Sequence, residues 1–259
     1  MSENRTSEHQ AASSEEKLEA VSLTETSKIL KKLDNFWYHY KWTVIVVTFF
    51  VAVGVICLVQ LFDRPKYDTS VVLATSYRMD SKEYGAFEAL MQDLVPEDFD
   101  GNGEKNINVV VYQYYSPAEI EQAKAEAAER ETEVFVINPQ YNNSELNAFT
   151  NYTMTGETSV CIVSPDVYAR LSEKNRLLPL TVIYGTGGMP AGTRADGFGI
   201  DLAETDLYKY NPAMTVLPSS SVLCILRPTV GGYSSDEGHY EQEKLFFRAL
   251  ADFAVVGEE

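Results

Sequence analysis

Residues 70–75, SVVLAT, decide the fold class, because this short apolar run is followed at once by a helical pattern. A run of this length, rich in β-branched residues, predicts a buried strand. Residues 81–95 then carry apolar side chains at helical spacing, which predicts a helix with one buried face: Phe87, Leu90, Met91 and Leu94. Strand followed by helix is the basic unit of an α/β domain.

The same alternation continues to the end of the chain. Further strands are expected at residues 107–114, 133–137, 159–163 and 220–226. Helices are expected at 117–130, where Ser116, Pro117 and Glu119 form a capping sequence, from Ser164-Pro165-Asp166 onward, and at 241–255. In the last helix, Leu245, Phe246, Leu250 and Phe253 are expected on one side. The pattern predicts an α/β domain with a mainly parallel sheet and helices on both faces. The glycine-rich residues 185–199 predict a long mobile loop.

Residues 42–62 form an uncharged apolar run, WTVIVVTFFVAVGVICLVQLF, that is long enough to cross a bilayer as a helix. A buried core helix is seldom uniformly apolar over such a length. A cleaved signal peptide would need a far longer n-region than usual, and no A-x-A-like site follows the run. The sequence therefore predicts one transmembrane helix as a permanent anchor.

Basic residues on the two sides of the span predict its orientation. Lys28, Lys31, Lys32 and Lys41 precede it, whereas only Arg64 and Lys66 follow closely. The positive-inside rule then places the N-terminus in the cytoplasm and the C-terminal domain outside the cell membrane. Aromatic residues gather at the inner end, as in a headgroup belt: Phe36, Trp37, Tyr38, Tyr40 and Trp42.

Four segments follow from this placement. Residues 1–25 are polar and predict a disordered cytoplasmic tail. Residues 26–41 predict a juxtamembrane helix, either lying on the inner leaflet or extending the span; the extension is favoured because no helix breaker separates the two. Residues 42–62 are the span, and residues 63–259 form the extracytoplasmic α/β domain.

The charge of the chain excludes some functions. The 259 residues include 21 Lys and Arg against 38 Asp and Glu, and residues 63–259 alone carry 15 against 31. This acidic excess argues against nucleic acid as a partner and favours cations. Three cysteines and three histidines are too few for a disulfide scaffold or a His-rich metal cluster.

One acidic turn resembles a calcium loop. Its oxygen-bearing side chains alternate with glycines, as a hard cation requires: Asp98, Asp100, Asn102 and Glu104. The match to an EF-hand loop is partial, because the twelfth position from Asp98 is Val109 rather than a bidentate acid. The alternative is an ordinary turn, since Asp, Asn and Gly are turn residues. Ca²⁺ is the one cofactor that the sequence suggests.

A ligand crevice is the second candidate site. Ligands of open parallel sheets bind outside the carboxyl ends of the strands. Those ends carry hydroxyl, amide and aromatic groups suited to a sugar, peptide or small polar solute: Thr75, Ser76, Tyr77, Tyr114, Tyr115, Ser116, Asn138 and Ser164. The same residues are ordinary strand-end and cap residues, and this alternative is favoured because strand ends always need caps.

Catalytic motifs are weak. Ser219, Ser220 and Ser221 are not in a G-x-S-x-G sequence, His239 lies in a polar loop segment, and Gly185-Thr186-Gly187-Gly188 lacks the Lys-Ser/Thr of a P-loop. Cys161 and Cys224 lie in apolar strands, where free buried thiols are favoured over a disulfide. We therefore expect no enzyme.

The lead-in at residues 32–42, KLDNFWYHYKW, the single span and the α/β pattern together resemble uncharacterised single-pass membrane-anchored proteins of Gram-positive bacteria. The segments that carry the resemblance are residues 133–139, 159–180, 199–202, Leu207-Tyr208 and 221–228, and the turn at 98–104 recurs in such proteins. The resemblance implies that the outer domain is a reduced extracellular solute-binding protein. Residues 63–259 depart from that pattern, since they leave little room for two lobes, and no ligand or catalytic residue carries over.

Two functional hypotheses follow. The first is a non-catalytic, membrane-anchored domain that binds a small solute or a cell-envelope partner. The second is a structural or assembly subunit of a membrane complex that docks proteins through its outer domain. A concave pocket with polar and aromatic groups favours the first, and an exposed apolar patch favours the second.

Overall fold

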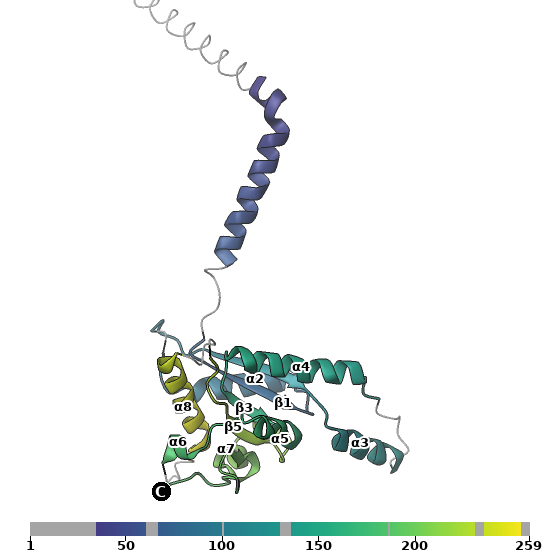
Figure 1. Cartoon of the computed structure of the whole chain (residues 1–259), viewed down its shortest axis with the longest axis vertical. Coiled ribbons are helices and arrows are strands. Elements are labelled where there is room, and N and C mark those ends of the chain that lie inside the picture. Colours follow the sequence, from purple (N-terminus) through teal and green to yellow (C-terminus); the bar gives the residue numbers. More distant parts are fainter. Residues whose placement is uncertain are drawn as a thin grey trace, which may run out of the picture. The chain divides into compact units, whose positions relative to one another are not determined.

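A computed structural model of the chain describes residues 35–60, 67–99, 101–129, 136–185, 187–230 and 236–254. The chain divides into two compact units, Met1–Pro65 and Lys66–Glu259, and each is described by itself. Figure 1 shows the helix in the described part of the first unit, and the sheet with its surrounding helices in the second.

The helix of the first unit is long and apolar enough to cross a membrane. It spans Asn35–Gln60, 26 residues, and none of its most apolar window is buried. At about 1.5 Å per residue, the length of this helix exceeds the thickness of a hydrocarbon core, which is about 30 Å.

The helix is continuous across the predicted boundary at residue 42, since residues 35–41 belong to it. Residues 1–34, which include the predicted tail and most of the predicted juxtamembrane segment, lie outside the described residues, as do residues 61 and 62 of the predicted span.

The second unit contains one five-stranded sheet in the order β2-β1-β3-β5-β4. Its strands are β1 (Thr69–Thr75), β2 (Ile107–Gln113), β3 (Val160–Val163), β4 (Gly199–Asp201) and β5 (Val222–Ile225). The central β1 is parallel to β2 on one side and to β3 on the other. β5 is antiparallel to both β3 and β4. The sheet is thus parallel in its core and mixed overall.

The reversal of β5 corrects the simpler expectation of a mainly parallel sheet. The connection from β4 to β5 holds η1 (Leu202–Glu204) and α7 (Asp206–Tyr210), and Leu202 N–H donates to the Ser221 carbonyl at 2.9 Å. β5 therefore begins at the same end of the sheet at which β4 ends. Only an antiparallel strand can begin there, since a parallel strand would need a crossover connection to the opposite end of the sheet.

Successive side chains of β1 enter two different hydrophobic clusters. Val71 and Leu73 pack with Phe87 of α2 (Ser81–Asp93) and Phe246 of α8 (Glu237–Ala251). Val72 and Ala74 instead pack with residues of α4 (Pro139–Thr155) and α5 (Pro165–Glu173), among them Phe149 and Val167. The alternation of side chains along a strand produces this division.

The predicted helices form, with differences at their ends. α2 begins after Asp80, whose carboxylate accepts from the backbone of Lys82 and Glu83, and α3 (Pro117–Glu129) begins after the predicted Ser116 cap. α8 starts at Glu237, earlier than expected. Leu245 is 45% exposed whereas Phe246 and Leu250 are buried, so the prediction that Leu245 shares their side of the helix is wrong. α4 and the short α6 (Thr181–Tyr184) were not predicted.

The predicted strand at residues 133–137 is wrong in its described part. Val136 and Ile137 lie in no helix or strand, Val136 is 83% exposed, and the sheet is complete without them. Residues 133–135 lie outside the described residues. Within the predicted loop 185–199, residues 187–198 contain no helix or strand, and β4 begins at Gly199.

Gly199 is required by close packing. A Cβ atom there would lie 2.6 Å from Cε2 of Tyr168 and 2.8 Å from Cγ1 of Val222. The Tyr168 hydroxyl is held by the Asp196 carboxylate at 2.9 Å, so the ring has little freedom to move away.

The two strand cysteines face one another. Cys161 and Cys224 are register partners in β3 and β5, both are buried, and both are free thiols. Burial raises the pKa of Cys161, and the neighbouring Cys224 raises it further. Cys161 is therefore expected to be an unreactive neutral thiol, since only the thiolate is a good nucleophile. Cys224 is buried as well, which shields it from reagents.

We predict that N-ethylmaleimide leaves Cys161 and Cys224 unmodified in the native chain and modifies both after unfolding. Intact-mass spectrometry of the Cys57→Ser variant measures this without the thiol of the apolar helix. Rapid native labelling, or a disulfide-linked mass before any treatment, would contradict the arrangement.

Candidate functional site

The predicted ligand residues gather at one edge of the sheet. The Tyr114 amide donates to the Thr75 carbonyl and the Ser164 amide to the Ala74 carbonyl, both at 2.9 Å, so the ends of β1, β2 and β3 are adjacent. β2 and β3 lie on opposite sides of β1, and their connections enter different clusters. The carboxyl ends of β1 and β3 thus form the topological switch point of the sheet, where ligands usually bind in open α/β folds.

Three hydroxyl groups at this edge are buried without a hydrogen-bond partner among the described residues. They belong to Thr75, Ser164 and Ser221, which are 1%, 3% and 1% exposed. Thr75 and Ser164 follow the register pair Ala74 and Val163, and Ser221 precedes the Val222 that pairs with Val163. A buried hydroxyl without a partner costs about 1–3 kcal/mol, so this row is suited to ordered water or a polar ligand group. Ser221 was not predicted as a ligand residue, because the reversal of β5 was not predicted.

The other predicted residues of this edge mostly hold helix starts. The Ser76 hydroxyl donates to Glu119 at 2.7 Å, and Glu119 also accepts from the Ser116 amide at 2.8 Å in the α3 capping box. The Tyr77 hydroxyl donates to Glu83 of α2 at 2.8 Å. These contacts agree with the alternative that the residues serve as caps.

Two further predicted residues, Asn138 and Tyr115, bond to the start of α4. The Asn138 side chain accepts from the amides of Gln140 and Tyr141 and caps the helix. The Asn142 side chain accepts from the Tyr115 amide at 2.8 Å and donates to the Tyr115 carbonyl at 2.9 Å. The edge of the sheet is thereby fastened to α4.

Tyr114 connects the edge with α5. Its buried hydroxyl lies 3.2 Å from Oδ2 of Asp166 and accepts from Nη2 of Arg170 at the same distance. Burial raises the pKa of Tyr114, and Asp166 raises it further, so the phenol stays neutral. Arg170 also donates from Nε to Asp166 at 2.7 Å.

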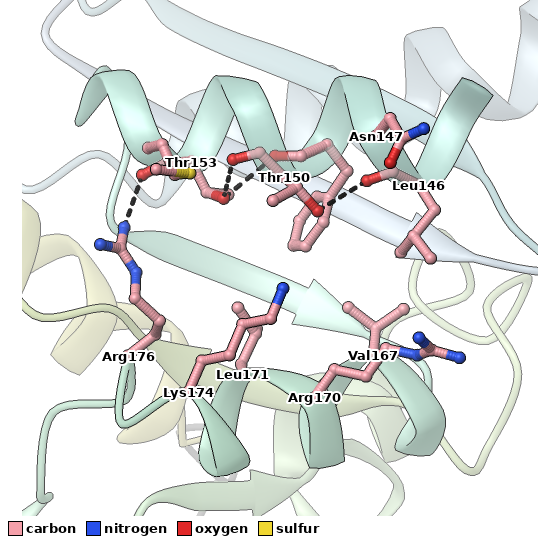
Figure 2. A pocket seen from close by; sticks show the side chains of 11 residues that line it. Leu146, Asn147, Thr150, Thr153, Val167, Arg170, Leu171, Lys174 and Arg176 are labelled. Carbon is pink, nitrogen blue, oxygen red and sulfur yellow. Dashed lines mark hydrogen bonds between the residues drawn. The ribbon is translucent and has the colours of Figure 1, made fainter. Parts of the chain in front are cut away.

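A pocket lies between α4 and α5 on the side of the sheet that holds Val72 and Ala74, and we call it the α4–α5 pocket. Its volume is about 340 Å³, at the small end of ligand sites. Figure 2 shows side chains from the two helices facing each other across it. α4 contributes Leu146, Asn147, Phe149, Thr150, Thr153 and Met154, and the α5 side contributes Val167, Arg170, Leu171, Lys174 and Arg176.

The lining combines an apolar floor with a basic rim. Phe149, Val167 and Leu171 belong to the buried cluster beneath the pocket. Three lining residues are cationic and none is acidic, although residues 63–259 have about twice as many acidic as basic residues. The pocket was not predicted from the sequence, because α4, which forms one of its walls, was not predicted.

The basic groups of the rim differ in their partners. Arg170 is paired with Asp166, and Arg176 donates from Nη2 to the Thr153 carbonyl in the last turn of α4 at 2.9 Å. The Lys174 ammonium group has no hydrogen bond or ion pair with any described residue. Figure 2 shows its side chain reaching into the space between the helices.

The acidic turn is organised by its own backbone. Oδ1 and Oδ2 of Asp98 accept from the amides of Gly101 and Gly103 at 2.8 and 2.7 Å, and Asn102 accepts from the Glu104 amide at 2.7 Å. Gly101 and Gly103 have φ of 70° and 91°. Asp100 lies outside the described residues, and no group of three metal-ligating side chains occurs among those described.

Buried Asp68 fastens this turn to the start of β1. Its two carboxylate oxygens accept from the amides of Phe99 and Asn106, both at 2.7 Å. Such charge-assisted bonds are among the stronger ones in proteins. Their position fixes the ends of the turn and leaves its tip exposed.

Calcium binding by the turn stays a prediction. Isothermal titration of the full chain at millimolar Ca²⁺ is expected to give a heat that is lost in Glu104→Gln, since a hard cation needs carboxylate oxygens. Absence of any such heat would leave the turn with a structural role alone.

His239 and Glu243 form a pair on α8. His239 Nε2 lies 3.6 Å from Oε1 of Glu243, whose side chain is fully buried. Glu243 raises the pKa of His239, against the opposing effect of burial, and Asp236 adds to the increase. The two side chains are four residues apart and so lie on the same face of the helix.

We predict that this pair makes stability depend on pH. A histidine whose pKa is raised on folding stabilises the fold fully below its unfolded value of about 6.5 and loses that effect as the pH rises through the folded value. The advantage of the native chain over His239→Gln should therefore decrease as the pH rises above about 6.5. Urea unfolding of the two detergent-solubilised chains measures it, and a constant difference would show that the pair does not titrate in this range.

The chain matches no known family, and comparisons with curated proteins and with solved structures find no similar protein.

Proposed function

We propose that this protein is a non-catalytic, membrane-anchored binding domain that takes a small solute in the α4–α5 pocket. The helix Asn35–Gln60 would be the anchor, with the N-terminus in the cytoplasm and the second unit outside. Two alternatives compete with this proposal. The domain could instead bind a cell-envelope partner, or it could be a structural subunit of a membrane complex.

The observation that carries the proposal is the combination of a concave space of about 340 Å³ with an apolar floor and a few polar groups. Ligand sites have this composition: apolar surface supplies affinity, and sparse polar groups fix orientation. The pocket lies between two helices that flank β3, a position that a rigid scaffold can maintain.

The architecture also supports a relation to one lobe of a solute-binding protein. The parallel core β2-β1-β3 and helices that contribute to two clusters suit such a lobe. Because the second unit has a single sheet in its described part, we place the ligand within the lobe rather than between two lobes.

Two matched tryptophan variants test the site. Asn147 and Asn151 both lie exposed on α4 one turn apart, but only Asn147 lines the pocket. Asn147→Trp should fill the opening with an indole, whereas Asn151→Trp should leave it free.

We expect at least one compound in a panel of sugars, amino acids, peptides and small carboxylic acids to raise the melting temperature of the full chain in nanodiscs. The increase should persist in Asn151→Trp and disappear in Asn147→Trp. Silence across the panel would favour the docking role, and an equal increase in both variants would place the ligand elsewhere.

A further inference from the structure

We infer that the α4–α5 pocket selects an anionic ligand with a short apolar body, in the simplest case a small aliphatic carboxylate. This inference rests on the proposed function and names the ligand class of the same site.

The charge of the rim points to an anion. Arg170, Lys174 and Arg176 line a single pocket of a domain in which acidic residues outnumber basic ones two to one. Asp166 compensates Arg170 through an ion pair of 2.7 Å, and Arg176 is bonded to the neutral carbonyl of Thr153. The rim therefore keeps an excess of positive charge in a domain whose net charge is negative.

Lys174 is the group that remains for a ligand. Lys174 directly follows α5, and its ammonium group has no partner among the described residues. Figure 2 shows the side chain reaching toward the space between the helices. An ammonium group is a compact charge with three donors, and a carboxylate can accept from it without a fixed geometry. Arg176, held in place by Thr153, is the second donor close to α4.

The floor determines the rest of the ligand. Phe149, Val167 and Leu171 offer apolar surface, and Thr150 and Thr153 offer little polarity because their hydroxyls donate to backbone carbonyls of α4 at 2.8 and 3.0 Å. An apolar body on this floor removes hydrocarbon from water. A volume of about 340 Å³ holds about ten non-hydrogen atoms at about 30 Å³ each.

Hexanoate, with about eight non-hydrogen atoms, is a suitable probe, and millimolar affinity is expected for so small a ligand. Hexanamide keeps the shape and loses the charge, and hexylamine reverses the charge. Hexyl phosphate tests whether a phosphate head, as in a lipid, is accepted in place of a carboxylate.

Met154 provides the readout, because it lines the pocket while Met79, Met91, Met189 and Met214 do not. The full chain is labelled with ¹³C at the methionine methyl groups and placed in nanodiscs of a neutral lipid, and Met154→Leu assigns the signal. Hexanoate should shift the Met154 methyl signal, whereas hexanamide and hexylamine should shift it far less at equal concentration.

Two exposed lysines give matched variants. Lys174→Gln should weaken hexanoate binding about threefold, the effect of one exposed charge pair, and should leave hexanamide unchanged. Lys82→Gln, on α2 and outside the pocket lining, should change neither.

The outcomes separate the two levels of the proposal. If hexanamide shifts Met154 as strongly as hexanoate, the pocket binds ligands but the preference for anions is overturned. If no probe shifts Met154, both the ligand class and the pocket as a binding site are overturned. If hexyl phosphate is the strongest probe, the anionic class stands and a lipid-type head replaces the carboxylate.

Discussion

The burial of β1 on both faces is the constraint on which the second unit depends. All seven of its residues are buried. A strand of this kind needs a hydrogen-bonded partner on each edge and packed side chains above and below it. β2 and β3 supply the edges, and the two hydrophobic clusters supply the faces.

The same constraint places the pocket. α4 precedes β3 in the chain and α5 follows it, and both helices contribute to the cluster that contains Val72 and Ala74. Two helices that flank the same strand leave a groove between them wherever short side chains face each other. Thr150 and Thr153 of α4 occupy such positions opposite Leu171, and the basic residues at the end of α5 close the rim. The net negative charge of the domain thus has a local exception at the basic rim of the α4–α5 pocket.

The sequence predicted the parts that depend on local patterns. The strand at 70–75, the helix of Phe87 and Met91, and the Ser116–Glu119 capping box follow from spacing and cap chemistry and are present. α4 was missed because its seventeen residues are mostly polar, and the few apolar ones acquire meaning only against β1 and β3. The reversal of β5 and the exposure of Leu245 depend on tertiary contacts that no local pattern contains. At the strand ends, the sequence pattern correctly predicted that Thr75 and Ser164 lie close together. The positions of Ser221, Lys174 and Arg176 could be identified only from the folded structure.

A crystal of the full chain soaked with hexanoate would show directly whether the α4–α5 pocket takes an anionic ligand. We expect electron density between Phe149 and Leu171, with the carboxylate within hydrogen-bond distance of Lys174 Nζ or the Arg176 guanidinium. Density at the strand ends beside Thr75, Ser164 and Ser221, with the α4–α5 pocket empty, would contradict it.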